Sequence, residues 1–144
     1  MFKKRIMVLF IFTVLTLAVL ASPVQVWSPQ SIEWNKIIQE LTDTYFTPAT
    51  KIPVQVQSIP WSGFEQKYLL AAASGDVPEV GITGSLGPAD LGIRGATVDL
   101  SKYGKEYQAL RSQMYPGLMR SFEFMGTNFG LPMQMVIYPM VYRA

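Results

Sequence analysis

The sequence contains no cysteine and no histidine in its 144 residues. Without cysteine the chain can form no disulfide, so its stability must come from its core alone. The absence of both residues also excludes Cys/His zinc sites and catalytic triads that depend on histidine. A bacterial lipoprotein carries its lipid on a cysteine just after its signal peptide. Because this chain has no cysteine, we expect no lipid anchor here.

Charged residues are also scarce, at 15% of the chain, whereas hydrophobic residues make up 49%. This composition is that of a folded chain, and the length suits about one domain. There are twelve Lys and Arg and ten Asp and Glu, but three of the basic residues lie together at positions 3–5. The remainder is close to neutral and has no basic patch that would indicate nucleic acid as a partner.

The start of the chain has the three-part layout of a secretory signal peptide. The basic residues at 3–5 precede an uncharged apolar run at 6–20, and a small residue, Ala21, follows at an acceptable cleavage site. This run of fifteen residues is shorter than the roughly 20 that span a bilayer. We expect residues 1–21 to direct export and to be removed; an uncleaved membrane anchor is the alternative.

Beyond the leader, the hydrophobic pattern predicts strands and helices in alternation. Short strands are expected at 23–28, 54–59 and 79–83, with a helix in each of the two intervals. The order β-α-β-α-β predicts a parallel sheet with crossover helices, because parallel neighbours need such connections. The fold class is therefore α/β, with a mostly parallel sheet flanked by helices.

The two crossover helices carry recognisable start and stop signals. Ser28 is expected to cap the first, with Pro29 in its first position, and Ser62 with Glu65 has the spacing of a capping box for the second. Gly75 is expected to end the second helix in a left-handed conformation. The expected buried faces are Trp34, Ile37, Ile38, Leu41 and Tyr45 on the first helix, and Phe64, Tyr68, Ala71 and Ala72 on the second.

Short elements are expected in the rest of the chain. They are a helix at 88–95, an irregular stretch at 97–103, a helix at 105–113, a helix with Pro116 in its first turn, a hairpin turning at 126–128, and a final apolar strand at 135–142.

Three segments carry a resemblance to a known family. They are YLLAAASGDVPEVGITGS at 68–85, LGIRGATVDLSKY at 91–103 and SFEFMGTNFGLPMQMVIYPMVYRA at 121–144. In order and spacing they resemble the extracellular solute-binding proteins of ABC importers, in the carbohydrate-binding family that includes maltose-binding protein. The sequence departs from the usual motifs in two places. Glu79 stands where aspartate is common, and MGTN at 125–128 replaces a DGK turn.

The resemblance implies a type II periplasmic-binding-protein fold and a chain about three times this long. Residues 22–144 would then be the amino-terminal part of lobe one in a two-lobe protein. It further implies a protein, monomeric at full length, that binds a solute between its lobes, closes by hinge motion and delivers the solute to membrane permease subunits. The expected location is periplasmic or extracellular.

Ligands of open α/β sheets bind outside the carboxyl ends of the strands, so the residues there are the candidate contacts. They are Trp27 and Ser28, Trp61 and Ser62, Gly84 and Ser85, and Gln134 after the hairpin. Indole faces suit the C–H surface of a sugar ring, whereas amides and hydroxyls suit its hydroxyl groups. Structural alternatives remain open: Trp61 as a core residue, Ser62 as a helix cap only, and Gly84 as plain loop.

The sequence gives little support to the hypothesis that the chain is an enzyme. Asp76 and Glu79 could form a carboxylate pair for glycoside hydrolysis, but they belong to a turn at the opposite end of the third strand. No nucleophile elbow, P-loop or dinucleotide fingerprint is present. We expect no catalytic residue, cofactor or metal, and interpret the chain as a sugar- or oligosaccharide-binding protein. A secreted or membrane-tethered adhesion or signalling fragment without a transported ligand is the alternative.

Overall fold

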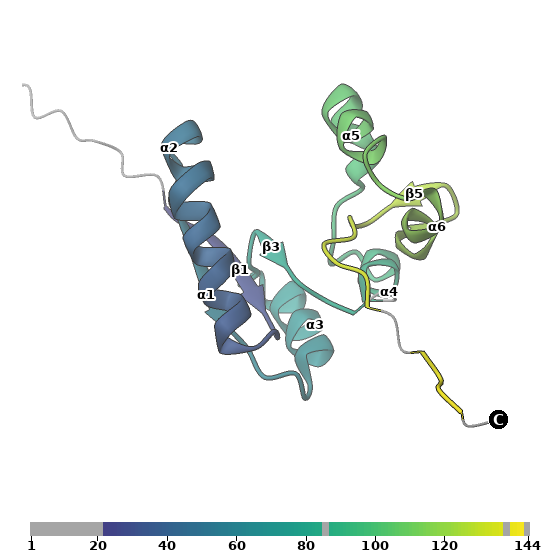
Figure 1. Ribbon diagram of the computed structural model, residues 1–144, viewed down its shortest axis with the longest axis horizontal. Coiled ribbons are helices and arrows are strands. Elements are labelled where there is room, and N and C mark those ends of the chain that lie inside the picture. Colours follow the sequence, from purple (N-terminus) through teal and green to yellow (C-terminus); the bar gives the residue numbers. More distant parts are fainter. Residues whose placement is uncertain (1–21, 85–86, 137–138, 143–144) are drawn as a thin grey trace, which may run out of the picture.

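A computed structural model describes residues 22–84, 87–136 and 139–142. A three-stranded sheet lies between helices α1 and α3, and short helices with a small hairpin form a second group beside it (Figure 1). The elements of the first group are β1 (Val24–Ser28), α1 (Ile32–Leu41), a π-helical segment (Thr42–Phe46), α2 (Thr47–Thr50), β2 (Val54–Ser58), α3 (Phe64–Ser74) and β3 (Val80–Gly81). The leader falls outside the described residues, and with it the expectation for 1–21.

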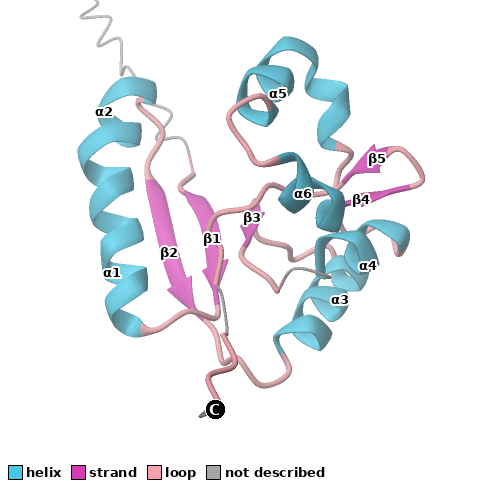
Figure 2. Ribbon diagram, turned by 45° about the vertical axis from the view of Figure 1, so that its right-hand side comes forward, coloured by secondary structure: helices cyan, strands magenta, loops and turns pink. Residues whose placement is uncertain are grey.

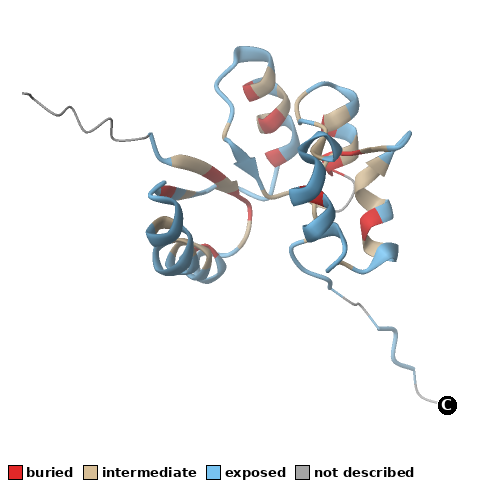
Figure 3. Ribbon diagram, turned by 90° about the horizontal axis from the view of Figure 1, so that it is seen from above, coloured by how far each residue is buried: buried red, intermediate tan, exposed pale blue. Residues whose placement is uncertain are grey.

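The strands confirm the predicted α/β class. Their order is β2-β1-β3, and both pairs are parallel. The register places Ser28 opposite Ser58 and Trp27 opposite Gly81, so the three carboxyl ends lie side by side. Each crossover passes over one face, which puts α1 and α3 on opposite sides of the sheet (Figures 1 and 3).

The first crossover helix begins three residues later than predicted. Ser31 is its N-cap, and its side chain accepts a hydrogen bond from the backbone N–H of Trp34 at 3.3 Å. Ser28 does not cap the helix, because its carbonyl still accepts from the Ile59 N–H at 2.9 Å in the ladder between β1 and β2. The chain therefore leaves the sheet only after Ser28, and Pro29 lies before the helix.

The predicted buried face of α1 is wrong, because most of its apolar stripe is exposed (Figure 3). Trp34 is 45% exposed, Ile37 46%, Leu41 51% and Tyr45 70%, and Ile38 is half-buried. Polar side chains of α1 face the sheet in their place. The amide of Asn35, which is 6% exposed, donates to the Ser58 hydroxyl at 2.6 Å and to the Gln30 carbonyl at 3.3 Å.

Gln39 completes this polar contact at the outer edge of the sheet. Its carboxamide donates to the Val54 carbonyl at 2.9 Å and accepts from the Val56 N–H at 2.8 Å. Gln39 thus satisfies two backbone groups of an edge strand that has no further neighbour among the described residues. Figure 2 shows α1 and α2 running alongside β2.

The core of the first group lies under α3, as its predicted face indicated. Phe64, Tyr68 and Ala71 are buried on this helix, and Ile59 and Leu91 pack with them. The predicted capping box is wrong: Gly63 is the N-cap, in a left-handed conformation with φ 77°, and no side chain caps the helix. The predicted left-handed C-cap is confirmed, since Gly75 has φ 78°.

The second group consists of α4 (Gly87–Ile93), a 3-10 turn (Leu100–Tyr103), α5 (Gly104–Arg111), α6 (Pro116–Met119), a second 3-10 turn (Arg120–Phe122), β4 (Glu123–Phe124) and β5 (Thr127–Asn128). The predicted helices and the hairpin are present here, and the stretch expected to be irregular contains the first 3-10 turn. The hairpin turns at Met125 and Gly126, one residue earlier than predicted. Both have positive φ, 49° and 80°, as a two-residue hairpin turn of type I′ requires.

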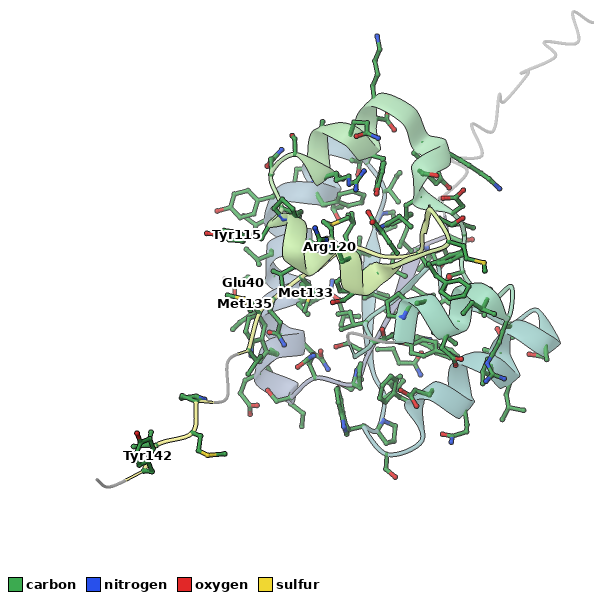
Figure 4. All side chains as sticks on the ribbon, turned by 90° about the vertical axis from the view of Figure 1, so that its right-hand side faces the viewer. Glu40, Tyr115, Arg120, Met133, Met135 and Tyr142 are labelled. Atoms are coloured by element: carbon green, nitrogen blue, oxygen red, sulfur yellow. The ribbon has the colours of Figure 1, made fainter. Side chains whose placement is uncertain are left out.

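The predicted final strand is absent from the described residues of the carboxyl-terminal segment. Residues 131–136 and 139–142 are in neither helix nor strand, and β4 pairs only with β5. Met133 and Met135 lie against the body of the molecule, whereas residues 139–142 extend away from it, with Tyr142 far out (Figure 4) and 84% exposed. Apolar residues alone do not make a strand, because a strand needs a neighbour for its backbone hydrogen bonds. No helix in the described part of the chain is long and apolar enough to cross a membrane.

Candidate ligand-binding site

One strand ends in predicted site residues at the carboxyl edge of the sheet, and the loops after the other two strands bring further ones there. β1 ends in Trp27 and Ser28, and the chain after β3 reaches Gly84 within three residues. Parallel pairing joins these ends, because the Ile82 N–H donates to the Trp27 carbonyl at 2.9 Å. The edge therefore has the geometry expected of a ligand site in an open α/β sheet.

Trp27 is half-buried, and its indole ring contacts two residues of α3. The ammonium of Lys67 lies 4.3 Å from the centroid of the indole ring, a cation–π distance. The ring of Tyr68 lies 5.8 Å away, tilted by 31°. Lys67 thus occupies part of the aromatic surface that we expected to receive a sugar.

Ser28 lies beside Trp27 but is fully buried, with 0% exposure. Its hydroxyl accepts from the backbone N–H of Gln30 at 3.3 Å. Its local role is therefore to hold the turn that leads into α1. As a ligand contact it remains a prediction that requires this turn to open.

Trp61 is 58% exposed, which overturns the alternative that it is a core residue. Its ring stands 5.0 Å from that of Phe64, which is buried at the start of α3. Ser62 is exposed next to it and does not cap the helix. Because Phe64 supports one side of the indole, Trp61 offers an aromatic surface to solvent just after β2.

Gly84 is half-buried in the loop after β3, and Thr83 organises this loop. The Thr83 hydroxyl donates to the Gly84 carbonyl at 2.9 Å, and its side chain packs closely against Gly87. A Cβ atom at Gly84 would have no heavy atom within 4 Å, and the φ angle of Gly84 lies outside the left-handed region. Glycine is therefore not required here for backbone conformation. Ser85 lies outside the described residues.

Gln134 is the candidate that the structure does not bring to the strand ends. It is exposed on the extended segment after β5, between Met133 and Met135, which are labelled in Figure 4. No hydrogen bond among the described residues links it to the sheet. Its place in the site remains a prediction.

Sequence reasoning missed the role of the Tyr68 hydroxyl, although it identified Tyr68 as a packing residue. The hydroxyl lies 2.9 Å from the Trp27 carbonyl and 3.2 Å from the Ile82 carbonyl, so it reaches the ends of β1 and β3 together. Burial raises the pKa of Tyr68 to about 12, which keeps the phenol protonated and able to donate. The available signal in the sequence was a tyrosine at a buried helix position, because a buried tyrosine hydroxyl usually finds a hydrogen-bond partner.

The hollows on the described surface include two open ones, each of about 550 Å³. The first runs beside α3 and is lined by Trp27, Gly63, Gln66, Lys67, Leu70, Ala71, Ser74 and Asp76. The second is lined by Thr97, Val98, Asp99, Lys102, Tyr103, Thr127 and Phe129, and hydrogen bonds from Ser101 lower the pKa of Asp99 there. Within the described ranges, no group of three or more acidic side chains could hold a metal ion.

This parallel sheet, with helices on both faces, matches part of the type II periplasmic-binding-protein fold. The chain belongs to the family of bacterial extracellular solute-binding proteins, whose family model matches residues 28–144. Members of this family are described as binding proteins and not as enzymes. Among curated proteins, none is significantly similar to the chain.

Solved structures share the fold. The Thermus thermophilus maltotriose binding protein, bound with maltotriose, is similar with a TM-score of 0.65 and 22% sequence identity over 76% of this chain. CpMnBP1 with mannotriose bound is similar with a TM-score of 0.66 and 22% identity, again over 76% of this chain. The chain spans 28% and 27% of the length of these two proteins. The similarity therefore covers the fold of one part of each.

Proposed function

We propose that this chain is part of an extracytoplasmic solute-binding protein that captures a carbohydrate, such as an oligosaccharide, for an ABC-type importer. The observation that carries the proposal is the carboxyl edge of the parallel sheet. Trp27 lies at the end of β1, Trp61 lies in the loop after β2, and Gly84 lies in the loop after β3. Membership of the solute-binding family supports the capture of a solute. The trisaccharides bound by two proteins of similar fold support a carbohydrate.

The chemistry at this edge suits a neutral, hydroxyl-rich ligand. Trp61 exposes an indole surface that can cover the C–H face of a sugar ring, and Ser62 beside it offers a hydroxyl. The loop at Thr83 and Gly84 lies at the same edge, after β3. No metal or cofactor takes part in this proposal, since recognition of a sugar needs only stacking and hydrogen bonds.

The chain forms, in this proposal, the amino-terminal part of lobe one, and the second lobe closes over the ligand by hinge motion. Trp27, Ser28, Trp61, Ser62, Gly84, Ser85 and Gln134 are the proposed contacts from this part. The closed protein, a monomer at full length, presents the ligand to the permease subunits. A mutant lacking the protein should therefore fail to take up the ligand that the purified protein binds.

The proposal also includes export of the protein, and cleavage of the signal peptide can test this part. Cleavage after Ala21 should give a mature protein that begins close to Ser22. Mass spectrometry of the protein from the extracytoplasmic fraction measures this terminus directly. Intact Met1 in a membrane fraction would instead identify a retained anchor.

The binding test is a calorimetric titration of maltotriose and mannotriose into the mature, full-length exported protein. Trp61→Ala should weaken binding by about tenfold, or ~1.4 kcal/mol, because it removes the exposed stacking surface. Trp34→Ala is the matched control, since Trp34 is similarly exposed but lies on α1. Equal losses from the two substitutions would contradict the placement of the site.

A further inference from the structure

The buried hydroxyl of Tyr68 lies at the strand edge, and its role there rests on the function proposed for that edge. Tyr68 is 6% exposed and comes from the middle of α3. Its hydroxyl is within hydrogen-bond distance of the carbonyl oxygens of Trp27, at 2.9 Å, and Ile82, at 3.2 Å. A phenol has one proton to donate, so the two carbonyl oxygens share it as acceptors. The hydroxyl therefore links the backbones of β1 and β3 at this point.

The position of the Tyr68 ring is fixed from several sides. Phe64 meets it edge-on, with ring centroids 6.2 Å apart, and Trp27 lies 5.8 Å away on β1. On the third side, a Cβ atom at Gly81 would come within 2.9 Å of the ring. The absence of a side chain at Gly81 therefore lets β3 pass directly over Tyr68, which brings the Ile82 carbonyl to its hydroxyl.

Both carbonyls lie within two residues of a proposed contact that follows them in the sequence. Trp27 is itself a proposed contact and is followed by Ser28, while Ile82 leads through Thr83 to Gly84. β3 has only two residues in the sheet, and its register with β1 consists of two pairs. So short a strand leaves the loop after it weakly held, and the Tyr68 hydroxyl supplies an additional tie at that point.

We infer that Tyr68 is a positioning residue for the ligand site, whose hydroxyl sets the spacing between the ends of β1 and β3. It touches no ligand in this account. It acts through the Trp27 and Ile82 carbonyls, and so determines how the loop at Gly84 faces the residues after β1. A preformed site of this kind binds more tightly, because less ordering of the loop remains to be done on binding.

The first test is hydrogen exchange in the ligand-free, full-length exported protein, comparing wild type with Tyr68→Phe. This substitution keeps the ring and removes only the hydroxyl. Amides in the 80–84 segment should exchange about fivefold faster, whereas those of β2 should keep their rates. A merely structural role would accelerate both segments alike, and either that result or unchanged exchange at 80–84 would overturn the inference.

The second test is the affinity of the same variants for maltotriose and mannotriose, measured well below the unfolding temperature. Tyr68→Phe should raise Kd about fivefold, or ~1 kcal/mol, while the control Tyr107→Phe stays within about twofold. Tyr107 is a suitable control because it is equally buried, at 4% exposure, but lies on α5. An unchanged Kd in Tyr68→Phe, with wild type binding, would overturn the inference.

A second variant approaches the same contact from the other side. Gly81→Ala keeps the Tyr68 hydroxyl but forces the ring away from β3, so it should also speed exchange at 80–84 and weaken binding. If wild type binds no carbohydrate, the carbohydrate proposal fails. The exchange measurements then still decide whether Tyr68 positions the loop, so the two failures are distinguishable.

Discussion

The ammonium of Lys67 lies 4.3 Å from the centroid of the Trp27 indole ring. This contact joins the middle of α3 to the last residues of β1, and it uses aromatic surface at the proposed site. A cation–π pair at a partly exposed position contributes about 0.5 to 1 kcal/mol. Lys67 is therefore both a stabilising residue and a neighbour of the proposed ligand contacts.

The first prediction is that Lys67→Met lowers the free energy of unfolding by about 0.5 to 1 kcal/mol, because it keeps the apolar stem and removes the charge. Urea denaturation followed by tryptophan fluorescence measures the change. Lys36→Met is the control, since Lys36 is exposed on α1. A loss no greater than that of the control would contradict a stabilising contact with Trp27.

The second prediction concerns the edge of β2. Gln39→Leu leaves the Val54 carbonyl and the Val56 N–H without their partner, so stability should fall by about 1 to 3 kcal/mol. An unpaired edge also invites pairing with other chains, so self-association should increase. Thermal unfolding and analytical ultracentrifugation measure the two effects.

The matched control is Gln57→Leu, which makes the same replacement at an exposed position of β2 itself. It adds the same apolar side chain but leaves the contact with α1 in place. If both variants associate equally, hydrophobic surface and not the exposed backbone is responsible, and our reading of Gln39 is wrong.

The third prediction is a pH dependence from Tyr68. Its pKa is about 12 in the folded protein and about 10 in an unfolded chain, because burial disfavours the ionised phenolate in the fold. Ionisation therefore costs no stability below about pH 10, and stability falls as the pH rises toward 12; the full loss corresponds to about 2 to 3 kcal/mol. Tyr68→Phe should flatten the decline, as denaturation at pH 9, 10.5 and 11.5 would measure. Parallel curves for the two proteins would refute it.

The fourth prediction separates binding from folding at two glycines. Gly84→Val should hardly change ligand-free thermal stability, because a Cβ atom there meets no neighbour, but it should cost tenfold or more in affinity, about 1.4 kcal/mol. Gly92→Ala should do the reverse, because its Cβ atom would lie 2.3 Å from the Phe129 ring and force the packing apart. Normal binding by Gly84→Val would show that its loop is structural.

Hydrophobic patterning was sufficient to predict the parallel sheet, because alternation and proline breaks mark the strands of this chain. It failed on α1, where the carboxamides of Asn35 and Gln39 contact β2 and the apolar stripe faces outward. Hydrogen bonds to a strand edge leave no hydrophobic period, so a pattern cannot reveal them. The hairpin turn was misplaced because Met125, unlike glycine, gives no sign of a positive φ.

The strand ends at which we place the proposed site could be predicted, because hydrophobic alternation and proline breaks mark them in the sequence. The environment of the site residues could not be predicted from the sequence. That Ser28 is buried, that Trp61 is exposed and that Lys67 lies over Trp27 all depend on how α3 and the loops pack. The same holds for Tyr68, whose helix face was predicted but whose hydroxyl partners lie 41 and 14 residues away in sequence.

The most direct test of the carbohydrate proposal is calorimetric titration of maltotriose and mannotriose, with other neutral oligosaccharides, into the mature full-length protein. We predict saturable one-to-one binding of at least one of them, with a Kd of about 10 µM or tighter. An amino acid mixture serves as the control and should give no binding heat. If no carbohydrate gives saturable heat while the protein is folded, the proposal that this family member captures a sugar is wrong.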